Sequence, residues 1–337
     1  MPEALAPIRG SDFTPLAREV RSSGLLDRQT GYYARSITFT VLGTAAIWAG
    51  VATVGASWWV LLLAVPLALL TARAGFLGHD AGHKQIARKN STNRLLGLLL
   101  GNLLIGMSYG WWNDKHNKHH LNPNHAEKDP DVGTGALVFT EQQAIDRKGL
   151  AWLTRHQAAL FFPMLLLEGL SLQASSIQDL RNRKGTERLV EGSLLAVHLI
   201  GYLVLAFTLM SPLTAVVFIA VHQGLLGLHL GSAFAPNHKG MPMPGPDECW
   251  DHLRKQVLTS RNVRPGRVTD WMLGGLNYQV EHHLFPSIPR PNLCKVQPLV
   301  REHCAKIGLP YTETGLVESY RQALGHLHDV AAPVRKA

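Results

Sequence analysis

Three short stretches of this 337-residue chain place histidines at the spacing of one helical face. They are HDAGH with His79 and His83, HNKHH with His116, His119 and His120, and QVEHH with Gln279, His282 and His283. Residues three or four apart share a face of a helix, and adjacent histidines fan out toward two neighbouring sites. Neutral imidazole is the commonest metal ligand and suits iron, zinc and copper. One such pair alone is more typical of a solvated helix face, but three together predict a shared metal site.

The number of histidines favours two metal ions over one. One ion takes about four to six ligands, and the seven histidines of these motifs exceed that number. The three cysteines, Cys249, Cys294 and Cys304, form no C-x-x-C pair, which indicates free thiols and argues against structural zinc. Bridging glutamates, as in carboxylate di-iron bundles, and the H-E-x-x-H pattern of zinc proteases are both absent from the motifs.

Two long blocks without Asp, Glu, Lys or Arg must position these motifs. They run from Ser36 to Ala72 and from Gly192 to Asn237, and each is long enough for two membrane spans. The predicted spans are 36–54, 57–77, 192–210 and 213–235, with turns at Gly55–Ser57 and Ser211–Pro212. The alternative is two buried hairpins of a soluble protein, but uncharged runs of this length are rare there.

Composition and charge support the membrane interpretation. The chain is 46% hydrophobic and 17% charged, whereas charged residues make up about a quarter of a typical soluble domain. Every Lys and Arg lies outside the two blocks, so the positive-inside rule places both termini and all charged segments in the cytoplasm. No secretory signal peptide is expected. The result is a predicted all-α integral membrane protein: four transmembrane helices as two hairpins, with a cytoplasmic helical cap that holds a di-metal site.

The remaining segments are assigned by composition. Leu95–Met107 is too short to span and is predicted to be buried or interfacial, and Ala158–Leu172 is predicted to be interfacial or, alternatively, a fifth span. Thr314–Val330 is predicted to be a surface helix. The predicted organisation is an N-terminal cytoplasmic segment 1–35, a main domain 36–300 with cytoplasmic parts 78–191 and 236–300, and a cytoplasmic tail 301–337.

The three motifs, their order and the hairpins between them resemble the membrane-bound fatty acid desaturase family. That family carries H-x-x-x-H, H-x-x-H-H and [H/Q]-x-x-H-H, and the stretch GGLNYQVEHHLFPSIPR at Gly274–Arg290 is especially similar to it. Gln279 in place of the first histidine, and DPDV at Asp129–Val132, resemble the front-end desaturases. The resemblance covers roughly residues 40–300. It implies a four-span, mushroom-shaped fold with a cytoplasmic di-iron site and an acyl tunnel.

The resemblance also implies the ligands, the co-substrate and the partners. It assigns two irons to His79, His83, His116, His119, His120, His282 and His283, and His238 in APNHKG is expected as an eighth ligand. Asp80, Asp129 and Asp131 are expected to orient imidazole N–H groups or, alternatively, to form salt bridges or helix caps. Gln279 is expected near the ligands as well, where it would hold a water or leave a coordination position open. His125 is either a site residue or part of a turn in NPNH. The other histidines, including His222 and His229, are expected to be structural. The chain has no haem-binding H-P-G-G, so electrons are expected from a separate ferredoxin or cytochrome b5-type protein, with O2 as co-substrate.

Two other functions fit the same residues. A hydroxylase acting on a lipid, an alkane or a carotenoid would share the scaffold and the first hydrogen abstraction. A non-catalytic membrane metal transporter is disfavoured, because transporters place polar ligands within their spans and these motifs flank them. The sequence favours a desaturase that inserts a cis double bond into an acyl-CoA or acyl-lipid, with no nucleic-acid partner.

Overall fold

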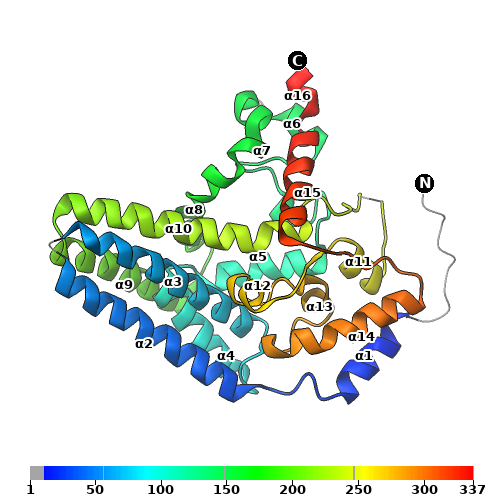
Figure 1. Ribbon diagram of the computed structural model, residues 1–337, viewed down its shortest axis with the longest axis horizontal. Helices are drawn as coiled ribbons and strands as arrows, with labels where there is room; N and C mark the ends of the chain where they lie inside the picture. The colour runs from blue at the N-terminus through cyan, green and yellow to red at the C-terminus, as the bar shows by residue number, and fades with distance from the viewer. Residues whose placement is uncertain (1–10, 56, 148, 246, 337) are drawn as a thin grey trace.

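Helices dominate the computed structural model, which describes residues 11–55, 57–147, 149–245 and 247–336 (Figure 1). Its four longest helical segments are each long and apolar enough to cross a membrane. They are α2 (Thr30–Val54), η1 with α3 (Trp58–Val60 and Leu61–Gly82), α9 (Gly185–Leu209) and α10 (Pro212–His238). A mostly helical fold with about four candidate membrane helices is therefore confirmed.

The two outer helices of this group expose their apolar side chains. Only 11% of the most apolar window of α2 and of α9 is buried, against 61% in η1–α3 and 50% in α10. Leu42 on α2 and Ile200 on α9 are each 63% exposed. Apolar surface of this extent is costly in water but matches the hydrocarbon core of a bilayer, so these helices belong to a membrane protein.

Gly55 and Ser57 lie at the same end of the four helices as residues 210–211. Val51, Val60, Ala206 and Ala215, one from each segment, share one buried core there. At Gly55 an added Cβ would lie only 2.0 Å from the carbonyl oxygen of Leu209, so the two connections touch. Ala56 of the first predicted turn lies outside the described residues.

The helices begin earlier than the charge-free blocks predict. α2 begins at Thr30 and α9 at Gly185, so the predicted boundary between residues 35 and 36 falls inside a helix. A helix can continue through charged residues, because its backbone hydrogen bonds do not depend on the side chains. Long charged side chains near a helix end can reach the membrane–water interface. The absence of charge therefore marks the apolar middle of each helix rather than its ends.

A second buried core lies at the opposite end of the molecule. It joins residues of α1 (Phe13–Ser22), α11 (His252–Leu258), α13 (Gln279–Leu284) and α14 (Leu293–Lys306). The predicted boundary at residue 300 falls inside α14, so residues 301–337 are not a separate tail. The all-α prediction also needs a small correction, because β1 (Asn262–Val263) pairs in parallel with β2 (Glu313–Thr314).

Two pairs of helices are sharply bent. α4 (Asn90–Gly97) continues as the π-helical segment η2 (Leu98–Ile105) and meets α5 (Tyr109–Leu121) at 109°. α7 (Ala151–Leu165) meets α8 (Glu168–Asp179) at 84°. Each pair is either a broken span or a re-entrant element, which would raise the number of spans to six if both pairs crossed.

The remaining helices are shorter than the four candidate spans. They are η3 (Pro130–Val132), α6 (Glu141–Asp146), α12 (Arg267–Met272), η4 (Arg290–Asn292), α15 (Leu316–Asp329) and α16 (Ala332–Lys336). The predicted surface helix over Thr314–Val330 is α15, but one of its faces is covered. Leu327 is buried, and the Tyr320 hydroxyl donates to the carbonyl oxygen of Ser232 on α10.

Candidate metal centre

Helix ends and short helices bring the histidines together in one region at the ends of two candidate spans. His79 and His83 end α3, and His238 ends α10. The HNKHH histidines lie in the last turns of α5, and His282 and His283 lie on the short helix α13. Four segments far apart in the sequence thus supply one site, as the three motifs predict.

The first group consists of His79, His83, His116 and His282, which could hold one metal ion. The Nε2 atoms of His79 and His282 are 3.2 Å apart, and those of His83 and His116 are 2.9 Å apart. Two imidazole nitrogens bound to one ion at about 2.1 Å each would lie about 3 to 4 Å apart. The spacing therefore fits metal ligation by these four side chains.

The second group consists of His119, His238 and His283, all three buried. The Nε2 atom of His283 is buried without a hydrogen-bond partner among the described residues. Such an atom costs free energy unless something else satisfies it, and a metal ion at this point would do so. His238, which the sequence suggested as an eighth ligand, lies in this group with its ring centroid 4.7 Å from that of His119.

His120 lies between the two groups. Its Nε2 atom is 3.0 Å from Nε2 of His116, and its ring stacks on His283 at 4.2 Å. Among the described residues, it belongs to none of the three groups that could hold a metal ion, the third being His119 with Asp129 and Asp131. Its expected role as a ligand therefore depends on the position of the ions.

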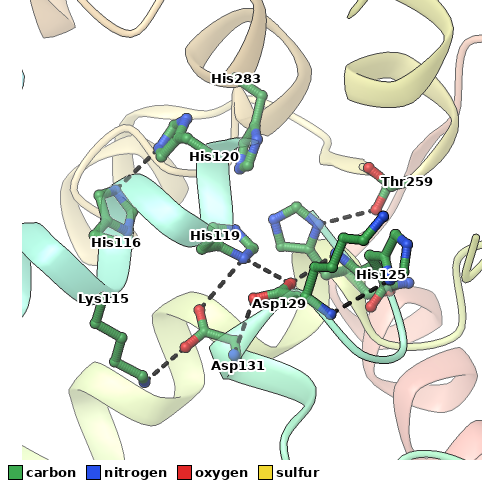
Figure 2. Close-up of polar contacts among 12 residues, drawn as sticks. Lys115, His116, His119, His120, His125, Asp129, Asp131, Thr259 and His283 are labelled. Atoms are coloured by element: carbon green, nitrogen blue, oxygen red, sulfur yellow. Dashed lines mark hydrogen bonds and ion pairs between the residues drawn. The ribbon is translucent and has the colours of Figure 1, made fainter. Parts of the chain in front are cut away.

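In each histidine of the second group, the Nδ1 atom lies within hydrogen-bond distance of an oxygen acceptor. His119 Nδ1 is 2.8 Å from Asp129 Oδ2, His238 Nδ1 is 2.9 Å from the Thr259 carbonyl oxygen, and His283 Nδ1 is 2.9 Å from Gln256 Oε1. Figure 2 shows His119 directed at Asp129 on one side, with His120 and His283 beyond it. A donor Nδ1–H fixes the tautomer and leaves Nε2 free to bind a metal. The sequence pointed to Asp129, but nothing in it pointed to Gln256 or to the Thr259 carbonyl.

The other expected supporting residues differ in their contacts. Asp80 Oδ1 is 3.2 Å from His79 Nδ1, and its second oxygen is 2.7 Å from the buried guanidinium of Arg290. Asp131 Oδ2 lies 3.5 Å from His119 Nδ1, and its main partner is Lys115 at 2.6 Å. Arg290 was not selected from the sequence, although it closes the stretch that carries the third motif.

Gln279 points into the second group. Its Nε2 atom is 2.9 Å from His238 Nε2, and its Oε1 accepts a hydrogen bond from Asn237. The amide thus lies at the metal-facing nitrogen of His238. This is where the missing first histidine of the third motif would reach.

The electrostatics of the site favour neutral imidazoles. Burial, followed by repulsion among neighbouring histidines, lowers the pKa of His83, His282 and His283 well below its ordinary value. Imidazole binds metals only in its neutral form. The lowered pKa of these three imidazoles suits cation binding at neutral pH. His119 differs, because burial lowers its pKa but the hydrogen bond to Asp129 and the charge of Asp131 raise it overall.

A cavity of about 410 Å³ runs past both groups. Its walls include His116 and His119 beside apolar residues of α3, α8 and α10, such as Phe76, Leu172 and Leu230. Lys115, Asp131 and Glu168 form a charged part of its wall. Volumes of 300 to 1,000 Å³ with mainly apolar walls are usual for binding sites of small ligands.

The histidines expected to be structural lie outside both groups, and most are held by hydrogen bonds. His222 contacts Thr71 and Tyr202, and His229 contacts the Met272 carbonyl oxygen. His125 Nδ1 accepts from two backbone amides of its own turn. Backbone carbonyl oxygens accept from His156, His198, His303 and His326 in the same way.

This arrangement defines a class: a membrane protein in which histidines at the ends of apolar helices gather around a candidate metal centre beside an apolar cavity. Comparison with known proteins gives the family. Residues 56–315 match the model of the fatty acid desaturase family, and the chain belongs to this family.

Several named desaturases are similar to the chain. It is 30% identical to the acyl-lipid (9-3)-desaturase of Physcomitrium patens, over 81% of this chain and 53% of that protein. It is 27% identical to the mouse fatty acid desaturase 2-like protein FADS2B, over 92% of this chain and 64% of that protein. It is 29% identical to the delta(6)-fatty-acid desaturase fat-3 of Caenorhabditis elegans, over 96% and 75%. The chain thus spans only about half to three quarters of these relatives.

Proposed function

We propose that this protein is an O2-dependent fatty acyl desaturase that inserts a cis double bond into an acyl chain carried as an acyl-CoA or an acyl-lipid. The observation that carries the proposal is the largely apolar cavity that passes both histidine groups. Two iron ions would be held by His79, His83, His116 and His282, and by His119, His238 and His283, with His120 between them. Bound iron would supply the O2 chemistry that removes hydrogen from an unactivated CH2 group, which no side-chain base can do.

The protein's own residues would position the metal ligands and the acyl chain. Asp129, Gln256 and the Thr259 carbonyl oxygen keep three imidazoles turned toward the second ion. Phe76 and Leu230 line the apolar wall that holds the acyl chain beside His116 and His119. Holding one carbon pair at the site selects where hydrogen is removed.

The proposed topology follows from the same geometry. The helices α2–α3 and α9–α10 would form two membrane hairpins whose connections lie on the far side of the bilayer. The cap, the metal centre and both termini would then be cytoplasmic, in agreement with the positions of Lys and Arg.

A separate ferredoxin or cytochrome b5-type protein would deliver the electrons. His83, His116 and His120 of the site are only partly buried, and Lys84 and Lys118 are exposed beside them in the sequence. A basic surface near the first group suits an acidic redox partner.

Expression in a host with a defined fatty acid composition tests the proposal. Gas chromatography with mass spectrometry should show a new double bond in cells that carry the wild-type chain and none with His119→Ala. A new hydroxyl group in place of the double bond would identify a hydroxylase. Metal uptake into vesicles without any change in lipids would identify a transporter.

A further inference from the structure

The turn at residues 106–108 joins η2 to α5 and lies deep in the protein. The backbone changes direction there by 109°, and Gly106 has a φ of +75°. An added Cβ at Gly106 would lie 2.4 Å from the ring of His198, so α9 packs directly on the turn. Irregular backbone at membrane depth is tolerated only where other protein groups satisfy its N–H and C=O groups.

One buried carboxylate accepts three hydrogen bonds around this turn. Glu191 of α9 is 1% exposed, and its Oε2 atom accepts from Ser108 Oγ at 2.5 Å, Gly110 N at 3.2 Å and Asn102 Nδ2 at 3.2 Å. A buried carboxylate inside a candidate span is expensive and marks a functional element. Its position at the positive end of α5 lowers that cost.

Other side chains of α8 and α9 also contact the turn. Ser176 Oγ accepts from Ser108 N at 2.9 Å, and His198 Nδ1 is 2.8 Å from the Leu103 carbonyl oxygen. Gln173 Nε2 is 3.5 Å from the Ile105 carbonyl oxygen. We call Gln173, Ser176, Glu191 and His198 the turn socket.

The turn connects two parts of the proposed site. At one end it starts α5, which carries His116, His119 and His120. Beside the turn, Ile105 and Met107 line the cavity together with Leu172 and Leu230. The same four residues also line a smaller void between α8 and α10. A movement of this turn would therefore displace the histidines of α5 and change the inner end of the cavity together.

We propose that Glu191 is a positioning residue: through the turn socket it fixes both the second histidine motif and the depth of the acyl cavity. The effect on metal binding rests on the geometry alone, and the effect on acyl-chain length rests also on the proposed function. A carboxylate suits this position because three donors converge on one oxygen, and a charged oxygen accepts hydrogen bonds more strongly than an amide oxygen does. An amide in its place would either accept the three hydrogen bonds with an uncharged, weaker oxygen or turn its N–H groups toward the donors.

Glu191→Gln in the full-length protein tests this inference, with Asp114→Asn as the matched control. Asp114 is an acidic residue of α5, but its side chain is 63% exposed, and its ion pair among the described residues is with Arg183. Hydrogen–deuterium exchange and metal content are measured on purified protein without substrate. Glu191→Gln should speed exchange at residues 108–111 about ten-fold or more and reduce metal per chain, whereas Asp114→Asn should match the wild type.

Product analysis gives the second readout. Glu191→Gln should shift the ratio of desaturated products between shorter and longer acyl chains, which a general loss of folded protein would not do. Glu191→Asp, which keeps the charge, should restore part of the metal content. Wild-type exchange and metal content in Glu191→Gln would overturn the inference. If Glu191→Gln yields no folded protein, Ser176→Ala is measured by the same criteria. If the wild type itself forms no double bond, the proposed function fails while exchange and metal content still decide the role of Glu191.

Discussion

Asp129→Asn should weaken metal binding at the second histidine group. Asp129 is 3% exposed, and three donors converge on its two oxygens. His119 Nδ1 and Asn124 N lie 2.8 and 2.7 Å from Oδ2, and Asp131 N lies 2.9 Å from Oδ1. Asparagine keeps the shape but replaces one acceptor by an NH2 group, so at least one of the three donors loses its partner.

The expected size of the effect follows from the type of contact. Loss of a partner behind a metal-binding histidine typically reduces metal affinity about 10- to 100-fold. This corresponds to about 1.4 to 2.8 kcal/mol, since each factor of ten is about 1.4 kcal/mol. The unpartnered donor itself would cost about 1 to 3 kcal/mol, which agrees with this range.

Asp131→Asn is the matched control. Its carboxylate is 36% exposed, pairs mainly with Lys115, and lies 3.5 Å from His119 Nδ1. A partly exposed ion pair contributes about 0 to 1 kcal/mol, so its loss should change metal affinity by less than about five-fold. Competition with a chelator, read by metal content per chain in monodisperse protein, measures both variants. Wild-type affinity in Asp129→Asn, or a larger loss in Asp131→Asn, would refute this account of how His119 is held.

Three further perturbations have defined outcomes. Gly227→Ala should lower the melting temperature, because the new Cβ would lie 2.4 Å from the Leu165 carbonyl oxygen, while Gly201→Ala, with open space around it, should not. Burial raises the pKa of Glu281 to about 7. The folded state therefore binds the proton of this carboxyl group more tightly than the unfolded state does, so the free energy of unfolding falls as pH rises from about 5 to 7. Glu281→Gln should remove that slope in melting curves of the metal-free protein. Leu172→Trp should narrow the inner end of the cavity and shift products toward shorter acyl chains in lipid analysis.

The sequence predicts the site better than it predicts the ends of the elements around it. Histidine spacing is a local property of a helix, so the motifs could be recognised without knowing the fold. The partners that hold the imidazoles come from elsewhere: Gln256 is on α11, and Thr259 contributes only a backbone carbonyl. A backbone group has no sequence signal, and a single glutamine has little. Arg290 could have been found, because it lies in the stretch that resembles the family most.

The charge-free blocks also placed Glu191, a buried carboxylate, outside the predicted span. The second block begins at Gly192 because Glu191 precedes it, and the predicted span therefore began at residue 192. In the structure α9 begins at Gly185, and Glu191 lies inside it, facing the start of α5. A prediction from hydropathy ends the membrane segment at a carboxylate, because an isolated charge in the bilayer costs free energy. Three donors from Ser108, Asn102 and Gly110 remove that isolation. The apolar stretch Leu95–Met107 leads into the turn that supplies these donors. A charged residue at the edge of an apolar segment can thus lie inside the helix when another part of the chain supplies a turn with donors that need an acceptor.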